Sequence, residues 1–151
     1  MKPFFIKLFQ YDLWANLLMI QAMFKTSPIN ERAKAKMTHI LGAHQIWLQR
    51  ITGAVADNSL FQTQDDFEVC AKKFCEKIID YLNTIDDLEL KKILEYRNMK
   101  GEPSRSNLED ILVQLGTHGV YHRGQIATAL KQSGLEPPAT DFIVYTRQLN
   151  K

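Results

Sequence analysis

The segment that decides the fold covers residues 106–134 and reads SNLEDILVQLGTHGVYHRGQIATALKQSG. Its apolar stripe has the spacing of one face of an α-helix and consists of Leu108, Ile111, Leu112, Leu115, Gly119, Ile126, Ala129 and Leu130. Ser106 to Glu109 has the pattern of a capping box at a helix start. Gly134 suits the position that follows a helix end. The segment therefore predicts a long amphipathic helix that ends near Ser133.

Two histidines four residues apart lie on this predicted helix. His118 and His122 share one face, with His122 inside the apolar stripe and His118 near its edge. A buried imidazole needs a hydrogen-bond partner or a metal ion, so the pair is either part of a metal site or two core histidines satisfied by polar neighbours. Gly116, Gly119 and Gly124 flank the pair. Each is less favourable than alanine by about 1 kcal/mol in a helix, which indicates a close approach or a need for space.

Helical periodicity recurs in three earlier segments, which are 4–25, 30–52 and a stretch that starts after Asp65 or Asp66 and includes Ile85. Asn30 is a favourable N-cap for the second of them. Long helices with short connections are typical of antiparallel bundles. We therefore predict an all-α fold, an antiparallel four-helix bundle.

A different pattern separates the third and fourth predicted helices. Residues 93–97 alternate as in a strand, and 98–103 contain a turn glycine, so we expect a short hairpin before the last long helix. The tail 141–151 has enough apolar residues to pack against the helices. The whole chain, 1–151, is predicted to be one domain.

The predicted helix 30–52 carries two more histidines. His39 and His44 are separated by about 140° around a helix, so one ion is not expected to bind both. The centre of the apolar stripe favours His44 as the inward side chain and places His39 at its flank. One helix does not fix the geometry of a site, and the spacing leaves the choice between the two open.

Composition limits the classes of partner. The net charge of +2 comes from 19 basic and 17 acidic residues scattered along the chain, so no basic patch predicts nucleic-acid binding. The longest apolar run of the N-terminal segment, Leu17 to Ile20, is too short for a secretory signal or a membrane span. We expect a cytoplasmic protein that binds no membrane. Cys70 and Cys75 lack redox or zinc-finger spacing and are expected to be reduced, partly buried thiols.

Several enzyme classes lack their motif here. The sequence HGVYH does not contain the glutamate of the HExxH peptidases. The chain also has no Glu-x-x-His of di-iron bundles, no GxGxxG, no P-loop and no GxSxG.

Four stretches together resemble one known family. They are 11–16 (YDLWAN), 39–48 (HILGAHQIWL), 94–103 (LEYRNMKGEP) and 121–126 (YHRGQI). They resemble the DinB-like (YfiT-like) superfamily of metal-binding four-helix bundles, and the resemblance spans nearly the whole chain.

The resemblance implies a set of metal ligands. One histidine of the second helix and two of the later helix hold the metal in this family, which maps to His39, by its spacing to Trp47, and to His118 and His122. The family therefore selects His39 where periodicity favours His44. His44 becomes a candidate neighbour of the ligands, together with Tyr121, Arg123 and Gln125; for Arg123 a surface salt bridge is at least as good an explanation.

The resemblance also implies a chemistry. The expected cofactor is a divalent metal ion, zinc or nickel, and the expected assembly is a homodimer. Some relatives are S-transferases that use a low-molecular-weight thiol, so the leading hypothesis is an enzyme that activates such a thiol, or water, for a small electrophile. Its catalytic residues are unknown. The alternatives are a non-catalytic metal-binding protein of a stress response and a purely structural bundle.

Overall fold

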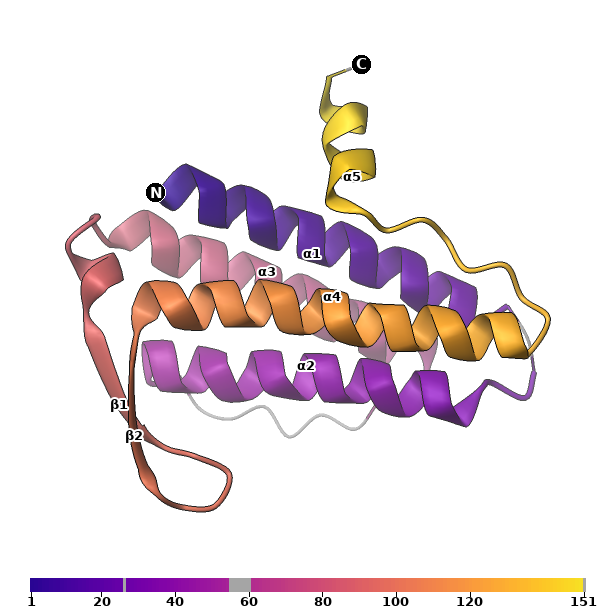
Figure 1. Cartoon of the computed structure of the whole chain (residues 1–151), viewed down its shortest axis with the longest axis horizontal. Coiled ribbons are helices and arrows are strands. Elements are labelled where there is room, and N and C mark those ends of the chain that lie inside the picture. Colours follow the sequence, from indigo (N-terminus) through magenta and orange to yellow (C-terminus); the bar gives the residue numbers. More distant parts are fainter. Residues whose placement is uncertain (26, 55–60, 151) are drawn as a thin grey trace.

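Four long helices lie side by side in the computed structural model, which describes residues 1–25, 27–54 and 61–150 (Figure 1). They are α1 (Lys2–Met23), α2 (Glu31–Thr52), α3 (Gln64–Thr84) and α4 (Leu108–Gln132). A 3₁₀ turn, η1 (Glu89–Lys91), precedes a two-stranded sheet of β1 (Ile93–Arg97) and β2 (Pro103–Asn107), and α5 (Phe142–Leu149) follows α4. The prediction of a mostly helical fold with a small hairpin is therefore confirmed.

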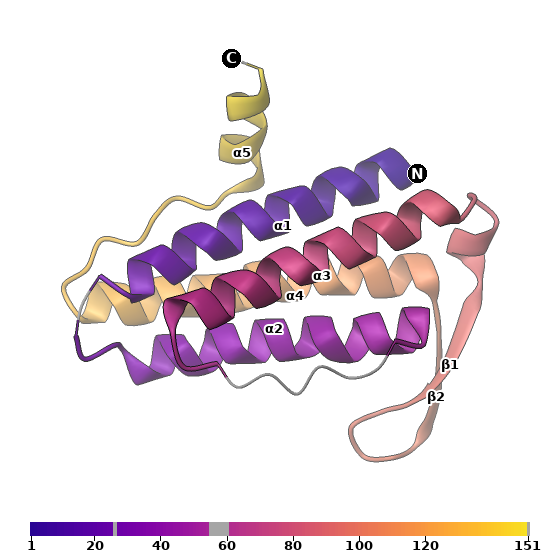
Figure 2. The ribbon, with the colours of Figure 1, turned by 180° about the vertical axis from the view of Figure 1, so that it is seen from behind.

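The helices run in directions that correct the strictly antiparallel prediction. One core cluster joins the end of α1 and the start of α2 to the start of α3 and the end of α4, and a second cluster joins their opposite ends. Hence α1 and α4 run in one direction while α2 and α3 run in the other (Figures 1 and 2). The neighbouring pairs α2/α4 and α1/α3 are antiparallel, whereas α1/α4 and α2/α3 are parallel.

The connection between α2 and α3 explains the difference. A short loop would make these helices antiparallel neighbours. Instead, α2 ends and α3 begins at opposite ends of the molecule. The 22 residues of α2 span roughly 33 Å at 1.5 Å per residue. A chain of the length of 53–63 can reach about as far when it is extended. The prediction of short connections is therefore wrong for 53–63, whose length allows a parallel pair.

Capping interactions fix the helix ends. The Asn30 side chain accepts a hydrogen bond from the Ala33 amide, as predicted for an N-cap. Thr63 and Asp66 form a reciprocal capping box that starts α3 slightly earlier than expected. After α4, Gly134 adopts a φ of +78°, and the amide of Leu135 donates to the carbonyl of Leu130. These bonds satisfy the last carbonyls of α4 with a Schellman-type end.

The predicted capping box at Ser106 is wrong. Asn107 is the N-cap of α4, and its side chain makes no capping hydrogen bond within the described structure. Ser106 belongs to β2, where it pairs with Leu94. Its hydroxyl lies 3.1 Å from the hydroxyl of Tyr96. The serine is therefore used by the sheet and is not available to the helix.

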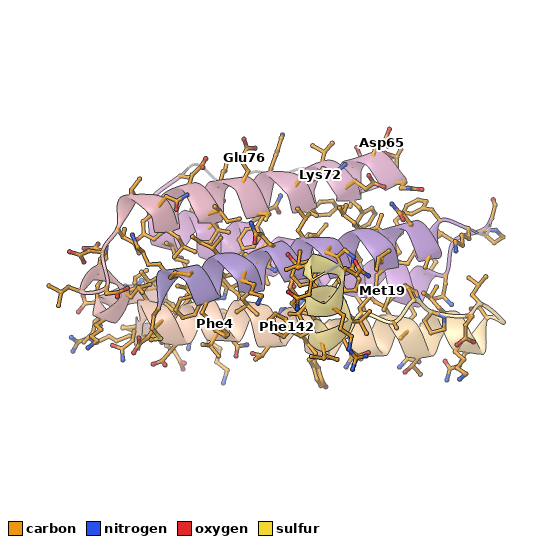
Figure 3. All side chains as sticks on the ribbon, turned by 90° about the horizontal axis from the view of Figure 1, so that it is seen from above. Phe4, Met19, Asp65, Lys72, Glu76 and Phe142 are labelled. Carbon is orange, nitrogen blue, oxygen red and sulfur yellow. The ribbon has the colours of Figure 1, made fainter. Side chains whose placement is uncertain are left out.

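The tail packs on one side of α1. In Figures 1 and 2, α5 lies on the α1 side of the molecule and projects away from α2, α3 and α4. Tyr145 is buried, and its ring lies against Tyr11 and Trp14 of α1. Asp65, Lys72 and Glu76 point outward from the exposed edge of α3 (Figure 3). Phe4 lies on α1, and Phe142 lies at the start of α5.

Among the described residues, none of the helices has the length and apolar character that a membrane span requires.

Two glycines of α4 allow α1 to approach closely. A Cβ at Gly116 would lie 2.8 Å from Leu8 Cδ2, and a Cβ at Gly119 would lie 2.5 Å from Asp12 Oδ1. At Gly124, by contrast, no described atom lies within 4 Å of a Cβ position. The predicted close approach therefore applies to Gly116 and Gly119, and it is made to α1.

We expect Gly119→Ala to lower the free energy of unfolding by about 1–3 kcal/mol, because the added methyl overpacks the contact with Asp12. Gly124→Ala is the matched control, since it adds the same atom in open space and should raise stability by up to about 1 kcal/mol. Urea unfolding of both variants measures the difference. Equal effects of the two substitutions would contradict the close contact.

Candidate metal centre

Three histidines from two helices meet at one point. His39 of α2 and His118 of α4 bring their Nε2 atoms to 3.1 Å. The ring of His122, one turn further along α4, lies 4.6 Å from the ring of His39 between centroids. One ligand atom from each of the three lies within 4.8 Å of the others. The antiparallel pair α2/α4 thus joins residues that are far apart in the chain.

The spacing of these nitrogens fits a metal ion. Zinc binds histidine nitrogens at 2.0–2.1 Å, so two ligands of a tetrahedral site lie about 3.4 Å apart. The 3.1 Å between the Nε2 atoms of His39 and His118 is close to that value, and the ligand atoms of all three histidines lie within 4.8 Å of one another. His122 is buried, His118 is half-buried and His39 is exposed, so one side of the cluster is open to small molecules.

Gln125 orients the most buried of the three rings. Its Oε1 lies 2.9 Å from Nδ1 of His122. An amide oxygen only accepts hydrogen bonds, so Nδ1 carries the proton and donates it. The other nitrogen, Nε2, then has the lone pair that a metal requires. This is how outer partners commonly fix metal-binding histidines.

The environment keeps two of these histidines neutral. Burial, followed by the charges of His122 and His39, lowers the pKa of His118 to about 4. The pKa of His39 is also lowered, by partial burial and then by His122 and Lys36. A metal ligand must be unprotonated, and both rings are in that state at neutral pH. The same neutral state would arise in a cluster without an ion, so the donor geometry carries the assignment.

His44 does not join the cluster. It is completely buried and stacks on Phe74 of α3, with 4.0 Å between ring centroids and 15° between planes. Burial lowers its pKa, although Asp12 opposes this in part. The ring is therefore neutral, and the 3.4 Å from its Nε2 to Asp12 is not an ion pair. Among the described residues, neither ring nitrogen has a hydrogen-bond partner.

Arg123 forms a buried ion pair instead of a surface salt bridge. Its Nη1 donates to Asp12 Oδ1 at 2.5 Å and to Asn16 Oδ1 at 2.8 Å. The amide of Asn16 in turn donates to Asp12 Oδ2 at 2.9 Å. All three side chains are about 1% exposed. Arg123 thus binds α1 and does not contact the histidine nitrogens.

Asp12 and Asn16 belong to the stretch 11–16 that resembles the family, but the sequence did not predict their bonds to Arg123. They interrupt the apolar N-terminal segment at i, i+4 spacing, and that interruption was the available sign of a buried polar network. Tyr121, the remaining candidate, is 66% exposed. Its ring lies 5.0 Å from that of His122, so it borders the open side of the cluster.

Comparison with known proteins agrees with this architecture. The sequence model of the DinB family matches residues 24–149. The chain belongs to the DinB family. It is 24% identical to Protein DinB of Bacillus subtilis (strain 168), an alignment that covers 96% of this chain and 95% of that protein. The crystal structure of a DinB-like protein from Bacillus subtilis has the same fold, with a TM-score of 0.63 and 18% identity, over 91% of this chain and 97% of the other.

The buried His44 gives stability a pH dependence. Its folded pKa is lowered, so above about pH 6.5 the ring is neutral in both folded and unfolded chains. Below that pH, the unfolded chain binds a proton that the folded protein does not, and the free energy of unfolding falls by up to about 1.4 kcal/mol per pH unit for this group.

We therefore expect the urea midpoint of the metal-free protein to fall between pH 6.5 and about 5, and more steeply in the wild type than in His44→Gln. Parallel pH profiles would show that His44 is not the group responsible.

Proposed function

We propose that this DinB-family chain is a metal-binding four-helix bundle protein that activates a small thiol for transfer to an electrophile. The observation that carries the proposal is the convergence of three imidazoles, with ligand atoms within 4.8 Å of one another. Nitrogen ligands suit zinc and nickel, and three of them leave room for a further ligand. His39, His118 and His122 would hold the ion.

The protein's own residues prepare this site. Gln125 fixes the tautomer of His122, and partial burial keeps His118 neutral. The exposed His39 leaves access from solvent. The buried bonds of Arg123 to α1 hold the α4 backbone next to His122.

The chemistry that the ion would supply is deprotonation of a thiol. A thiol with an ordinary pKa near 8.5 is mostly protonated at neutral pH, whereas a coordinated thiol is deprotonated. In the transfer, sulfur would form a bond to an electrophilic carbon, the leaving group would depart with its bonding electron pair, and the thiol proton would pass to solvent. The chain supplies the position of the reacting sulfur, and we assign no general base.

The remaining expectations about partners are part of the same proposal. We infer a cytoplasmic homodimer that binds neither nucleic acid nor membrane. An apolar groove of about 590 Å³ between α1, α4 and the tail supports an interface. Phe4, Val113 and Val120 at this groove are about half exposed, and large exposed apolar side chains that cluster often mark association sites.

Metal content tests the site. We expect the wild type to bind about one equivalent of zinc or nickel and His39→Ala and His118→Ala to lose it, because each removes one of three ligands. His44→Gln is the matched control on the same helix as His39. It should keep the metal, since the His44 ring faces Phe74 of α3. Elemental analysis after dialysis gives the stoichiometry, and circular dichroism checks the fold. Full metal retention in the two alanine variants would refute the assignment.

Thiol activation is tested with a spectroscopic metal. Cobalt-loaded protein should develop a sulfur-to-cobalt charge-transfer band when mercaptoethanol is added, and ethylene glycol should produce none. The loaded protein should then accelerate consumption of the thiol by chlorodinitrobenzene. A band without consumption would favour the non-catalytic metal-binding alternative. Metal binding without any band would overturn thiol activation.

A further inference from the structure

A groove begins at His39 and follows the outer face of α2 to the hairpin. It has a volume of about 490 Å³ and is lined on α2 by Gly42, Ala43, Ile46 and Arg50, with Tyr96 and Met99 on the hairpin side. Gly42 forms an open floor, because no described atom lies within 4 Å of a Cβ placed there. The groove therefore leads from the open side of the histidine cluster to a second end at Arg50.

The far end of the groove carries a positive charge. The Arg50 guanidinium lies 4.7 Å from the ring centre of Trp47 and 4.9 Å from that of Tyr96. Its Nη2 donates to the carbonyl of Arg97 at 2.7 Å. No carboxylate of the described residues forms an ion pair with it, and none of the described lining residues is acidic.

These contacts prepare Arg50 to bind an anion. Cation–π contacts with two rings and one hydrogen bond to the backbone hold the guanidinium in place, so little side-chain freedom remains to be lost on binding. A planar guanidinium binds a carboxylate through paired hydrogen bonds.

We propose that this groove binds a small thiol that carries a carboxylate, with the carboxylate at Arg50, an apolar middle over Gly42 and Ile46, and the sulfur at the histidine cluster. This inference rests on the proposed function, since it names the thiol class for that site. It adds a specificity residue, Arg50, that lies outside the histidine cluster.

The length of the groove sets the length of the ligand. His39 and Arg50 are three helical turns apart, roughly 16 Å along α2. The guanidinium lies over Trp47, about one turn back toward His39, which leaves a gap of roughly 11 Å. An extended eight-carbon acid spans about this distance, whereas a three-carbon acid does not.

The experiment titrates cobalt-loaded protein with mercaptooctanoate, mercaptooctanol and mercaptopropanoate and follows the sulfur-to-cobalt band. The wild type should bind mercaptooctanoate about tenfold more tightly than mercaptooctanol, as expected for a charged hydrogen bond. Arg50→Gln should abolish this preference and leave the affinity for mercaptooctanol unchanged. Mercaptopropanoate should not respond to the substitution, because it is too short to reach.

Two further variants control the result. Arg32→Gln removes an exposed arginine of the same helix outside the groove, and it should retain the preference. Gly42→Leu fills the floor and should weaken both eight-carbon thiols at least about tenfold, with mercaptoethanol unaffected. An unchanged preference in Arg50→Gln would overturn the inference while the proposed function stood. A missing band with every thiol, mercaptoethanol included, would overturn the proposed function and this inference with it.

Discussion

The buried ion pair between Asp12 and Arg123 is the constraint on which the rest of the structure depends. A buried charge without a partner is strongly unfavourable, so removal of one member of such a pair typically destabilises a protein by about 3–5 kcal/mol. Here the pair joins α1 to α4, and Asn16 bonds to both members. Gly119 is required beside it because any larger side chain would overlap the carboxylate. The rotation of α4 relative to α1 is thereby fixed.

That rotation places the histidine cluster. Arg123 directly follows His122 in the chain, and adjacent residues of a helix differ by about 100°. When Arg123 points to α1, His122 points to α2, where His39 lies. His118 lies one turn before His122 on α4 and points to the same side. The ion pair in the core and the histidine cluster at the edge of the core therefore lie on two faces of α4, and the ion pair orients the cluster.

The position of the cluster also explains why it is open. It lies at the margin of the α2/α4 contact, where His39 is exposed and His122 is buried. A site in the centre of the bundle would exclude solvent, and His44 occupies such a position against Phe74. The margin gives both a buried wall and access to the groove between α2 and the hairpin. Such a combination suits a site that receives small molecules.

The sequence by itself determined the helices, the hairpin and the inward position of His122. The family resemblance predicted the group of His39, His118 and His122, which the structure brings together. These features follow from local periodicity, from turn residues and from motifs within single segments. The directions of α2 and α3, the choice of His39 by geometry and the partner of Arg123 were decided only by the tertiary structure. The spacing along one helix gives the angle of a side chain but not the neighbour that it meets. Side chains of two helices form a site only when packing sets the rotation of each helix relative to its neighbours. In this chain, Asp12 and Gly119 determine how α1 and α4 pack.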